Sequence, residues 1–194
     1  RIRVMPPEQI AARLDDRFRL LTGGSRTALP RQQTLRALID WSWDLLLEPE
    51  KAALRRLSVF VGGWTLEAAE AVCARDSLEA GAVLDTLTRL VDKSLVLAED
   101  QVTDEHYRML ETMRQYAREK LLESGESGPV RDQHLDFFVA LGERGDAGLH
   151  GPEEAAWFSR LETEHANLRA ALEWSLNRGP AGTRAALRLC GALG

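Results

Sequence analysis

Apolar and polar positions alternate along most of this chain with the period of an α-helix. In the first segment Ile10, Leu14 and Phe18 recur at that spacing, and Gly23 and Gly24 interrupt it. A longer helix is predicted for about residues 32–46. Its expected inward face comprises Leu35, Leu38, Ile39, Ser42, Leu45 and Leu46, with Trp41 and Trp43 on the flanks. The pattern predicts a mainly helical fold.

More helices are predicted between residues 49 and 93. Pro49 suits a first helical turn, where its missing N–H costs nothing. Thr65 is a predicted N-cap, because its hydroxyl can accept a hydrogen bond from a first-turn amide. The inward positions of the three expected helices are Ala52, Ala53, Leu54, Leu57 and Phe60, then Leu66, Ala69 and Cys73, then Val83, Leu84, Leu87, Leu90 and Val91.

A short β-hairpin is predicted after the third of these helices. Residues 95–97 are apolar and bounded by Ser94 and a polar loop, which is typical of a strand, and residues 106–110 are the expected partner. From Glu111 the helical period returns, with Met113, Tyr116, Ala117 and Leu121 facing inward. The order of elements, helix, strand, turn, strand and helix, is that of a winged helix.

Residues 125–129 (GESGP) form the clearest boundary in the chain. Beyond them the pattern is entirely helical, with helices joined by short Gly/Pro loops, which favours an array of helical hairpins. Too few units are present to establish a repeat period. Both ends of the chain fall inside apolar patterns, and we expect it to be a piece of a longer protein.

Composition narrows the possible functions. The chain has 25 basic and 30 acidic side chains, and a net charge of −5 lowers the expectation of non-specific nucleic-acid binding. No stretch has the length and apolarity of a membrane span or the form of a signal peptide, so we expect a cytoplasmic protein without membrane contact. Cys73 and Cys190 are far apart on apolar helical faces, and both are predicted to be buried core thiols.

Five strings occur together in a fixed order: LLTGGSRTALPRQQTLRALIDWSWDLL, LRRLSVFVGGWTLEAAEAVCA, LVDKSLVLAE, YRMLETMRQYAREKL and EHANLRAALEWSL. Together they resemble bacterial transcriptional regulators of the signal-transduction ATPase class. This is the STAND or NB-ARC-like type, which includes large LuxR-like and AfsR-like regulators. The resemblance implies the C-terminal part of a helical (ARC1-like) domain at 1–46, a winged helix at 47–124 and the start of TPR-like helical repeats at 129–194.

In such proteins a P-loop nucleotide domain precedes these parts. The present chain contains no Gly-x-x-x-x-Gly-Lys-Ser/Thr sequence. We therefore expect that it is not an enzyme and that it holds no cofactor itself. ATP or ADP is implied for the parent protein only. The implied partners are an upstream nucleotide-binding domain in cis, and an inducer or protein at the repeats.

The resemblance also implies weak candidates for nucleotide sensing. NB-ARC switches carry a Met-His-Asp motif after the wing hairpin, and the matching string here is Met109-Leu110-Glu111. Leu110 cannot donate a hydrogen bond to a phosphate, which puts the ADP contact in doubt. Glu111 has a structural alternative, because an acidic residue at a helix start interacts favourably with the helix dipole. Arg26 belongs to a basic stretch that could face phosphates or simply be solvated (Arg17, Arg19, Arg26, Arg31 and Arg36).

A winged helix can also bind DNA. The charges on the predicted reading helix at 79–93 bear on that alternative. It carries Glu79, Asp85 and Asp92 against Arg89 and Lys93, a poor surface for a phosphate-lined groove. A packing role is therefore favoured, and direct DNA contact by this chain is not expected.

Two further sets of residues allow a functional as well as a structural interpretation. Glu162 and His165 have the spacing of a di-iron ligand pair, but the other carboxylates that such a site needs are not evident, so no metal is expected. Trp157 and Trp174 are expected in the core, with a ligand or partner groove as the alternative. The favoured function is a regulatory module that couples sensing by the repeats to an upstream ATPase domain; the alternative is a DNA-binding winged-helix domain.

Overall fold

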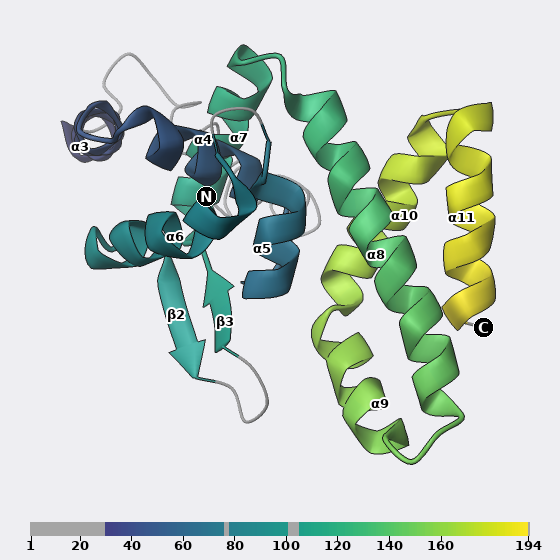
Figure 1. Cartoon of the computed structure of the whole chain (residues 1–194). Coiled ribbons are helices and arrows are strands. Elements are labelled where there is room, and N and C mark those ends of the chain that lie inside the picture. The colour runs from purple at the N-terminus through teal and green to yellow at the C-terminus, as the bar shows by residue number, and fades with distance from the viewer. Residues whose placement is uncertain (1–29, 76–77, 101–104, 194) are drawn as a thin grey trace, which may run out of the picture.

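The computed structural model describes residues 30–75, 78–100 and 105–193 (Figure 1). It is mainly helical with a small antiparallel sheet, as the sequence predicts. The helices are α3 (Pro30–Asp44), α4 (Glu48–Leu57), α5 (Leu66–Cys73), the 3-10 turn η1 (Ala80–Ala82), α6 (Val83–Asp92), α7 (Glu111–Glu123), α8 (Ser127–Leu149), α9 (Glu154–Thr163), α10 (His165–Asn177) and α11 (Pro180–Leu193).

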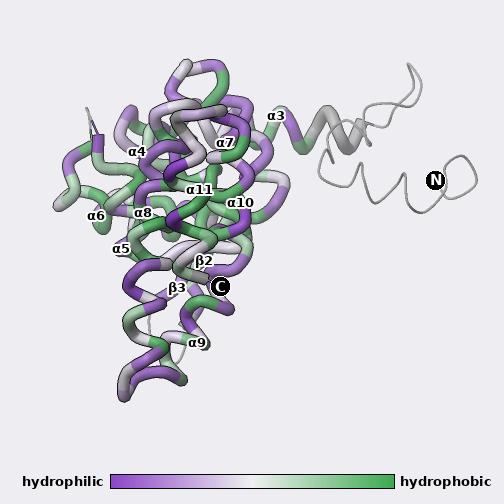
Figure 2. Tube along the Cα trace, turned by 90° about the vertical axis from the view of Figure 1, so that its right-hand side faces the viewer, coloured by the Kyte–Doolittle hydropathy of each residue, from purple (hydrophilic) through white to green (hydrophobic). Residues whose placement is uncertain are grey.

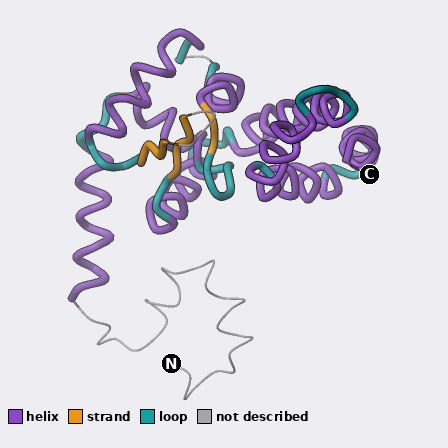
Figure 3. Tube along the Cα trace, turned by 90° about the horizontal axis from the view of Figure 1, so that it is seen from below, coloured by secondary structure: helices purple, strands orange, loops and turns teal. Residues whose placement is uncertain are grey.

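The strands β1 (Trp64–Thr65), β2 (Leu97–Asp100) and β3 (Glu105–Arg108) form one sheet in the order β1-β3-β2 (Figure 3). Sequence reasoning missed β1, which pairs Trp64 with Tyr107. It also placed the other strands inaccurately. The N–H groups of Leu95 and Val96 donate to the Leu90 carbonyl oxygen at the end of α6, so β2 begins only at Leu97.

The predictions for α4 and α5 are confirmed. The five apolar positions of α4 and the turn after it are buried, and Thr65 caps α5 by accepting a hydrogen bond from the Ala68 N–H at 3.3 Å. Ala69 and Cys73 are buried as predicted, and Leu66 is partly buried against the core. These helices, with α6, α7 and the sheet, make a winged helix.

Helices α8 to α11 form the helical array, with α10 and α11 packed along the long helix α8 (Figure 1). Gly145 and Gly148 of α8 leave no room for a Cβ atom because Leu161 and Trp157 of α9 lie directly against them. The array shares a single buried core with the winged helix, in which α5 packs on α8. The long face common to the two parts is called the seam below.

Helix α3 extends away from this body (Figures 2 and 3). Ile39 and Leu46 are buried, and Asp40 accepts a 2.8 Å hydrogen bond from the Tyr116 hydroxyl. The predicted inward face is wrong at Leu35, Leu38 and Leu45, which are exposed, and Trp41 on its predicted flank is exposed as well. The period correctly marks an apolar face, but the rest of the described chain covers only part of it.

The two cysteines also differ. Cys73 is buried as predicted, whereas Cys190 is exposed, which corrects the expectation of two core thiols. Helix α11 turns Ala186, Leu189 and Ala192 inward, and Cys190 falls beside that stripe rather than on it. Among the described residues, no helix has both the length and the apolarity that crossing a membrane requires.

Candidate functional site

The predicted reading helix of the winged helix, α6, has an exposed face with mixed charge. Asp85 and Asp92 lie on it beside Arg89 and Lys93. The Lys93 Nζ donates to the buried Glu50 carboxylate at 2.6 Å. Burial would raise the pKa of Glu50, but the hydrogen bond from Lys93 and the nearby charge of Arg89 lower it on balance. The positive charge of Lys93 is therefore paired with the buried carboxylate of Glu50.

The predicted nucleotide-sensing residues occupy the start of α7. Leu110 is half exposed immediately before the helix. The Glu111 carboxylate accepts two hydrogen bonds from Arg114 at 2.8 and 2.9 Å. This contact supports the structural interpretation of Glu111, and nucleotide sensing stays a prediction. Arg26 lies outside the described residues.

One half of the seam is a network of hydrogen-bonded polar side chains, which we call the clamp, although the Arg160 Nε within it has no hydrogen-bond partner among the described residues. Its centre is Asn167 of α10, which is buried and contacts the loop before β1. The Val61 N–H donates to its Oδ1 at 2.7 Å, and its Nδ2 donates to the Gly63 carbonyl oxygen at 2.9 Å and to the Glu164 carboxylate at 2.7 Å. Every polar atom of this amide is therefore used to join the two parts.

Ion pairs extend the clamp on both sides. Glu67 of α5 accepts hydrogen bonds from Arg144 of α8 at 2.8 Å and from Arg160 of α9 at 2.7 Å. At the junction of α7 and α8, Glu126 accepts from Arg55 at 2.7 Å and from the buried Arg56 at 2.9 Å. The hydrogen bonds from these two arginines lower the pKa of Glu126 to about 2.

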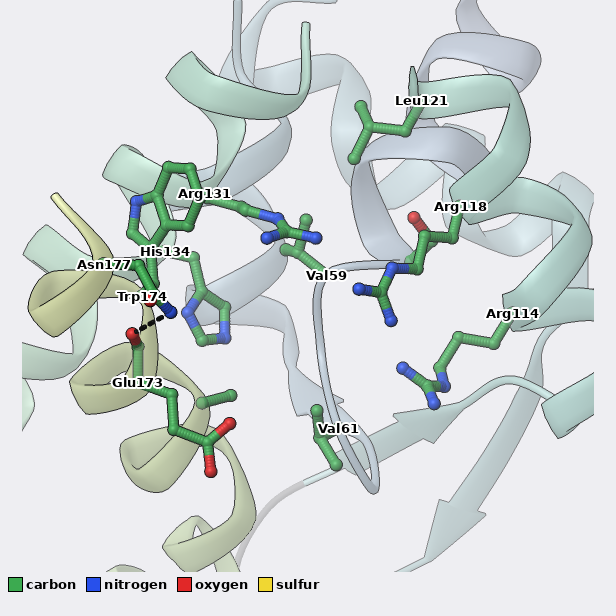
Figure 4. Close-up of a pocket in the computed structure, with 12 residues that line it drawn as sticks. Val59, Val61, Arg114, Arg118, Leu121, Arg131, His134, Glu173, Trp174 and Asn177 are labelled. Carbon is green, nitrogen blue, oxygen red and sulfur yellow. Dashed lines mark hydrogen bonds between the residues drawn. The ribbon is translucent and has the colours of Figure 1, made fainter. Parts of the chain in front are cut away.

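The other half of the seam contains a pocket of about 290 Å³ between α7, α8, α10 and the loop that follows α4 (Figure 4). We call it the basic pocket. It is lined by Ser58, Val59, Val61, Arg114, Arg118, Leu121, Arg131, His134, Ala170, Glu173, Trp174 and Asn177. The sequence offered Trp174 as a possible groove residue, and the structure places it in this wall. Trp157 does not line the basic pocket and instead packs on Gly148.

Three arginines and one acid set the charge of the basic pocket. Arg114 is neutralised by Glu111, whereas Arg118 has no ionic partner among the described side chains. Arg131 stacks over the Trp174 ring at 4.9 Å. Burial and the charge of Arg118 both lower the pKa of Arg131, so the two guanidinium groups lie close enough to repel each other. Glu173 has Arg169 as its partner at 3.2 Å.

His134 forms the inner wall of the basic pocket. It is 3% exposed, packs between Phe60 and Phe138, and its Nε2 has no hydrogen-bond partner among the described residues. Burial lowers the pKa of His134 to about 4, Arg131 acts in the same direction, and a hydrogen bond with Asn167 opposes them. The imidazole is therefore neutral near pH 7 and has an unused polar atom.

A second hollow lies within the array. It has a volume of about 870 Å³ and is mainly apolar, and its lining includes Glu162 and His165; its other lining residues are Leu149, Phe158, Leu161, Leu168, Arg169, Leu172, Leu189 and Cys190. No group of three or more possible metal-ligating side chains occurs in the described part of the chain.

Comparisons with known proteins agree with the winged helix. Residues 46–122 match a family model described as a winged helix-turn-helix domain. Relatives in Mycobacterium tuberculosis and Mycobacterium bovis are 51% identical over 182 residues, which cover 92% of this chain and 20% of the relative. Their name, an HTH-type transcriptional regulator, is itself provisional. The chain therefore spans about a fifth of the length of these curated relatives.

Another Mycobacterium tuberculosis relative, an uncharacterized protein, is 46% identical over 127 residues, covering 65% of this chain and 32% of that protein. No solved structure matches the chain. The chain is thus similar to bacterial regulators that carry a helix-turn-helix, and its winged helix is the part that the family model recognises.

Proposed function

We propose that this chain is the winged-helix regulatory segment of a DNA-binding transcriptional regulator. The observation that carries the proposal is the coincidence of two independent findings on the same residues. The family match covers residues 46–122, and the structure over those residues contains the helices and the three-stranded sheet of a winged helix. Two modes of action follow, and they predict different experimental results.

In the first mode the winged helix itself contacts DNA. The comparisons favour this mode, because they join a winged helix-turn-helix match to relatives named as HTH-type regulators. Contact would place the exposed face of α6 in the major groove. Arg89 would then be essential, since Lys93 is held by Glu50.

In the second mode the winged helix transmits a signal between the helical array and the rest of the parent protein. The charge distribution of α6 favours this mode, and so does the clamp that joins the two parts. The exposed apolar face of α3 would contact the upstream portion of the parent polypeptide, whose relatives are about five times as long as this chain. The proposed nucleotide switch, with ATP or ADP bound upstream, belongs to this mode.

Fluorescence anisotropy with labelled duplex DNA separates the two modes. A pool of duplexes selected for binding to the full-length parent regulator would be titrated with this chain at physiological salt. Specific sub-micromolar binding that Arg89→Gln weakens at least tenfold supports the first mode, since each lost phosphate or base contact reduces affinity.

The matched control is Arg184→Gln, which makes the same charge change on the exposed surface of α11. Absence of binding by this chain, with binding retained by the full-length parent, supports the second mode. If the full-length parent selects no duplex from random sequence, the proposal of a DNA-binding regulator is wrong.

A further inference from the structure

The basic pocket holds more positive charge than its described surroundings neutralise. Arg118 and Arg131 extend towards the same space from α7 and α8 (Figure 4). Like charges at short range oppose each other, and the lowered pKa of Arg131 has Arg118 as one of its causes. The ion pairs of the clamp show that this protein elsewhere places a carboxylate between facing arginines, as Glu67 does.

His134 gives a second, independent indication of a ligand. Buried polar side-chain atoms nearly always have a hydrogen-bond partner, and an unpartnered one costs about 1–3 kcal/mol. The His134 Nε2 is such an atom, and its side chain lines the same pocket as the two arginines. A bound group that can donate a hydrogen bond, such as the P–OH of a monoprotonated phosphate, would satisfy this nitrogen, and its negative charge would separate the two positive charges.

We propose that the basic pocket binds the phosphate group of a small phosphorylated molecule between Arg118 and Arg131. A phosphate monoester carries close to two negative charges and three acceptor oxygens, which match two guanidinium groups better than a carboxylate does. Arg114 adds positive charge at the edge of the pocket, although Glu111 already neutralises it.

The remaining walls define the organic part of the ligand. Val59, Val61 and Leu121 supply apolar surface, and Trp174 supplies an aromatic one. The volume of about 290 Å³ is near the lower limit of small-molecule sites, so it admits a phosphate with a small organic group. Glu173 lies on the wall formed by α10 and would disfavour additional negative charge there.

Binding at this place would have a mechanical consequence. Arg118 belongs to the winged helix and Arg131 to the array, so the ligand would bridge the half of the seam that lacks a clamp. This inference is independent of whether α6 contacts DNA, because none of the pocket residues lies on α6.

Isothermal titration calorimetry of this chain with phenyl phosphate and with inorganic phosphate tests the proposal. We expect saturable binding of phenyl phosphate, with inorganic phosphate weaker but dependent on the same residues. Arg118→Gln should weaken phenyl phosphate at least tenfold. Because Arg118 is exposed and has no ionic partner among the described side chains, the variant should keep the wild-type melting curve.

Three controls make the result decisive. Arg184→Gln has the same charge change away from the pocket and should bind as the wild type does. Benzoate offers a carboxylate on the same ring and should bind at least tenfold more weakly than phenyl phosphate. Sodium chloride at matched ionic strength should not reproduce the heat signal.

Several outcomes would overturn the proposal. These are no saturable binding of either phosphate at millimolar concentration, equal loss of affinity in the two arginine variants, or benzoate binding as tightly as phenyl phosphate. If duplex DNA displaces phenyl phosphate, the basic pocket is part of a nucleic-acid binding surface, and the small-molecule proposal would be wrong.

Discussion

The two halves of the seam join the same pair of structural units, but they differ in whether their arginines are paired with carboxylates. In the clamp, Asn167 uses both ends of its amide, and Glu67 lies between two arginines. In the basic pocket, Arg118 and Arg131 face each other, and the His134 Nε2 is unsatisfied within the described residues. Paired charges hold structure together, whereas two arginines that face each other without a carboxylate between them indicate a site for an anion.

The largest expected effect concerns the clamp. Asn167→Ala removes three hydrogen bonds and leaves the Val61 N–H and the Gly63 carbonyl without their partner. Each buried polar group left unpaired costs about 1–3 kcal/mol, so the free energy of unfolding should fall by about 4 kcal/mol. Urea denaturation measures it. Asn177→Ala, which removes only a bond to the Glu173 carbonyl on an exposed surface, should change stability by less than about 0.5 kcal/mol.

The second effect is the pH dependence of the free energy of unfolding that results from His134 in the pocket half of the seam. Its pKa falls from 6.5 in the unfolded chain to about 4 in the folded chain, so the unfolded state binds more protons between those values. Stability should be complete above about pH 6.5 and decline as the pH falls towards 4, by on the order of 3 kcal/mol.

His134→Phe keeps a flat ring among the aromatic neighbours and cannot be protonated. Thermal denaturation of the wild type and of this variant between pH 7 and pH 4 should give a steeper decline for the wild type. Identical slopes would show that His134 does not remain neutral inside the fold.

A smaller effect is expected at the junction of α7 and α8. Glu126→Gln removes the charge that Arg55 and Arg56 share and should cost about 2 kcal/mol, the range of hydrogen bonds between charged groups. Because the folded pKa of Glu126 is depressed to about 2, this contribution is present above about pH 4.5 and is lost as the pH falls towards 2. The wild-type and variant stabilities should therefore converge at acid pH in guanidinium titrations.

The smallest expected effect on stability tests most directly whether the basic pocket differs from the clamp. Arg118→Gln in the ligand-free chain should leave the free energy of unfolding unchanged or raise it by a few tenths of a kcal/mol, because its charge meets mainly the like charge of Arg131. A loss of more than about 1 kcal/mol in chemical denaturation would mean that Arg118 is a structural residue like those of the clamp.

Local signals predicted much of the fold. The cap at Thr65 and the buried faces of α4 and α5 depend on neighbours within a few residues, which the sequence displays directly. Strand β1 was missed because two residues show no period, and its partner Tyr107 is far away in the chain. The exposed face of α3 was misassigned because an apolar stripe does not reveal what covers it.

The candidate site was harder to predict. Arg118, Arg131 and His134 belong to two helices, and their meeting depends on how α7 packs against α8 and α10, which no spacing in the sequence encodes. Of the residues that line the basic pocket, only Trp174 could be proposed from the sequence as a possible groove residue. The three-domain division, the nucleotide-sensing role of Leu110, Glu111 and Arg26, and the inducer at the array stay predictions.

The contrast between the two cysteines has a practical consequence for following these units in solution. Burial raises the pKa of the Cys73 thiol to about 12, which suppresses the thiolate that alkylating reagents attack, whereas Cys190 is open on α11. A maleimide dye should therefore attach at a single position on the native protein without mutagenesis. Its emission would then report on rearrangements of the last described helix from a wild-type background.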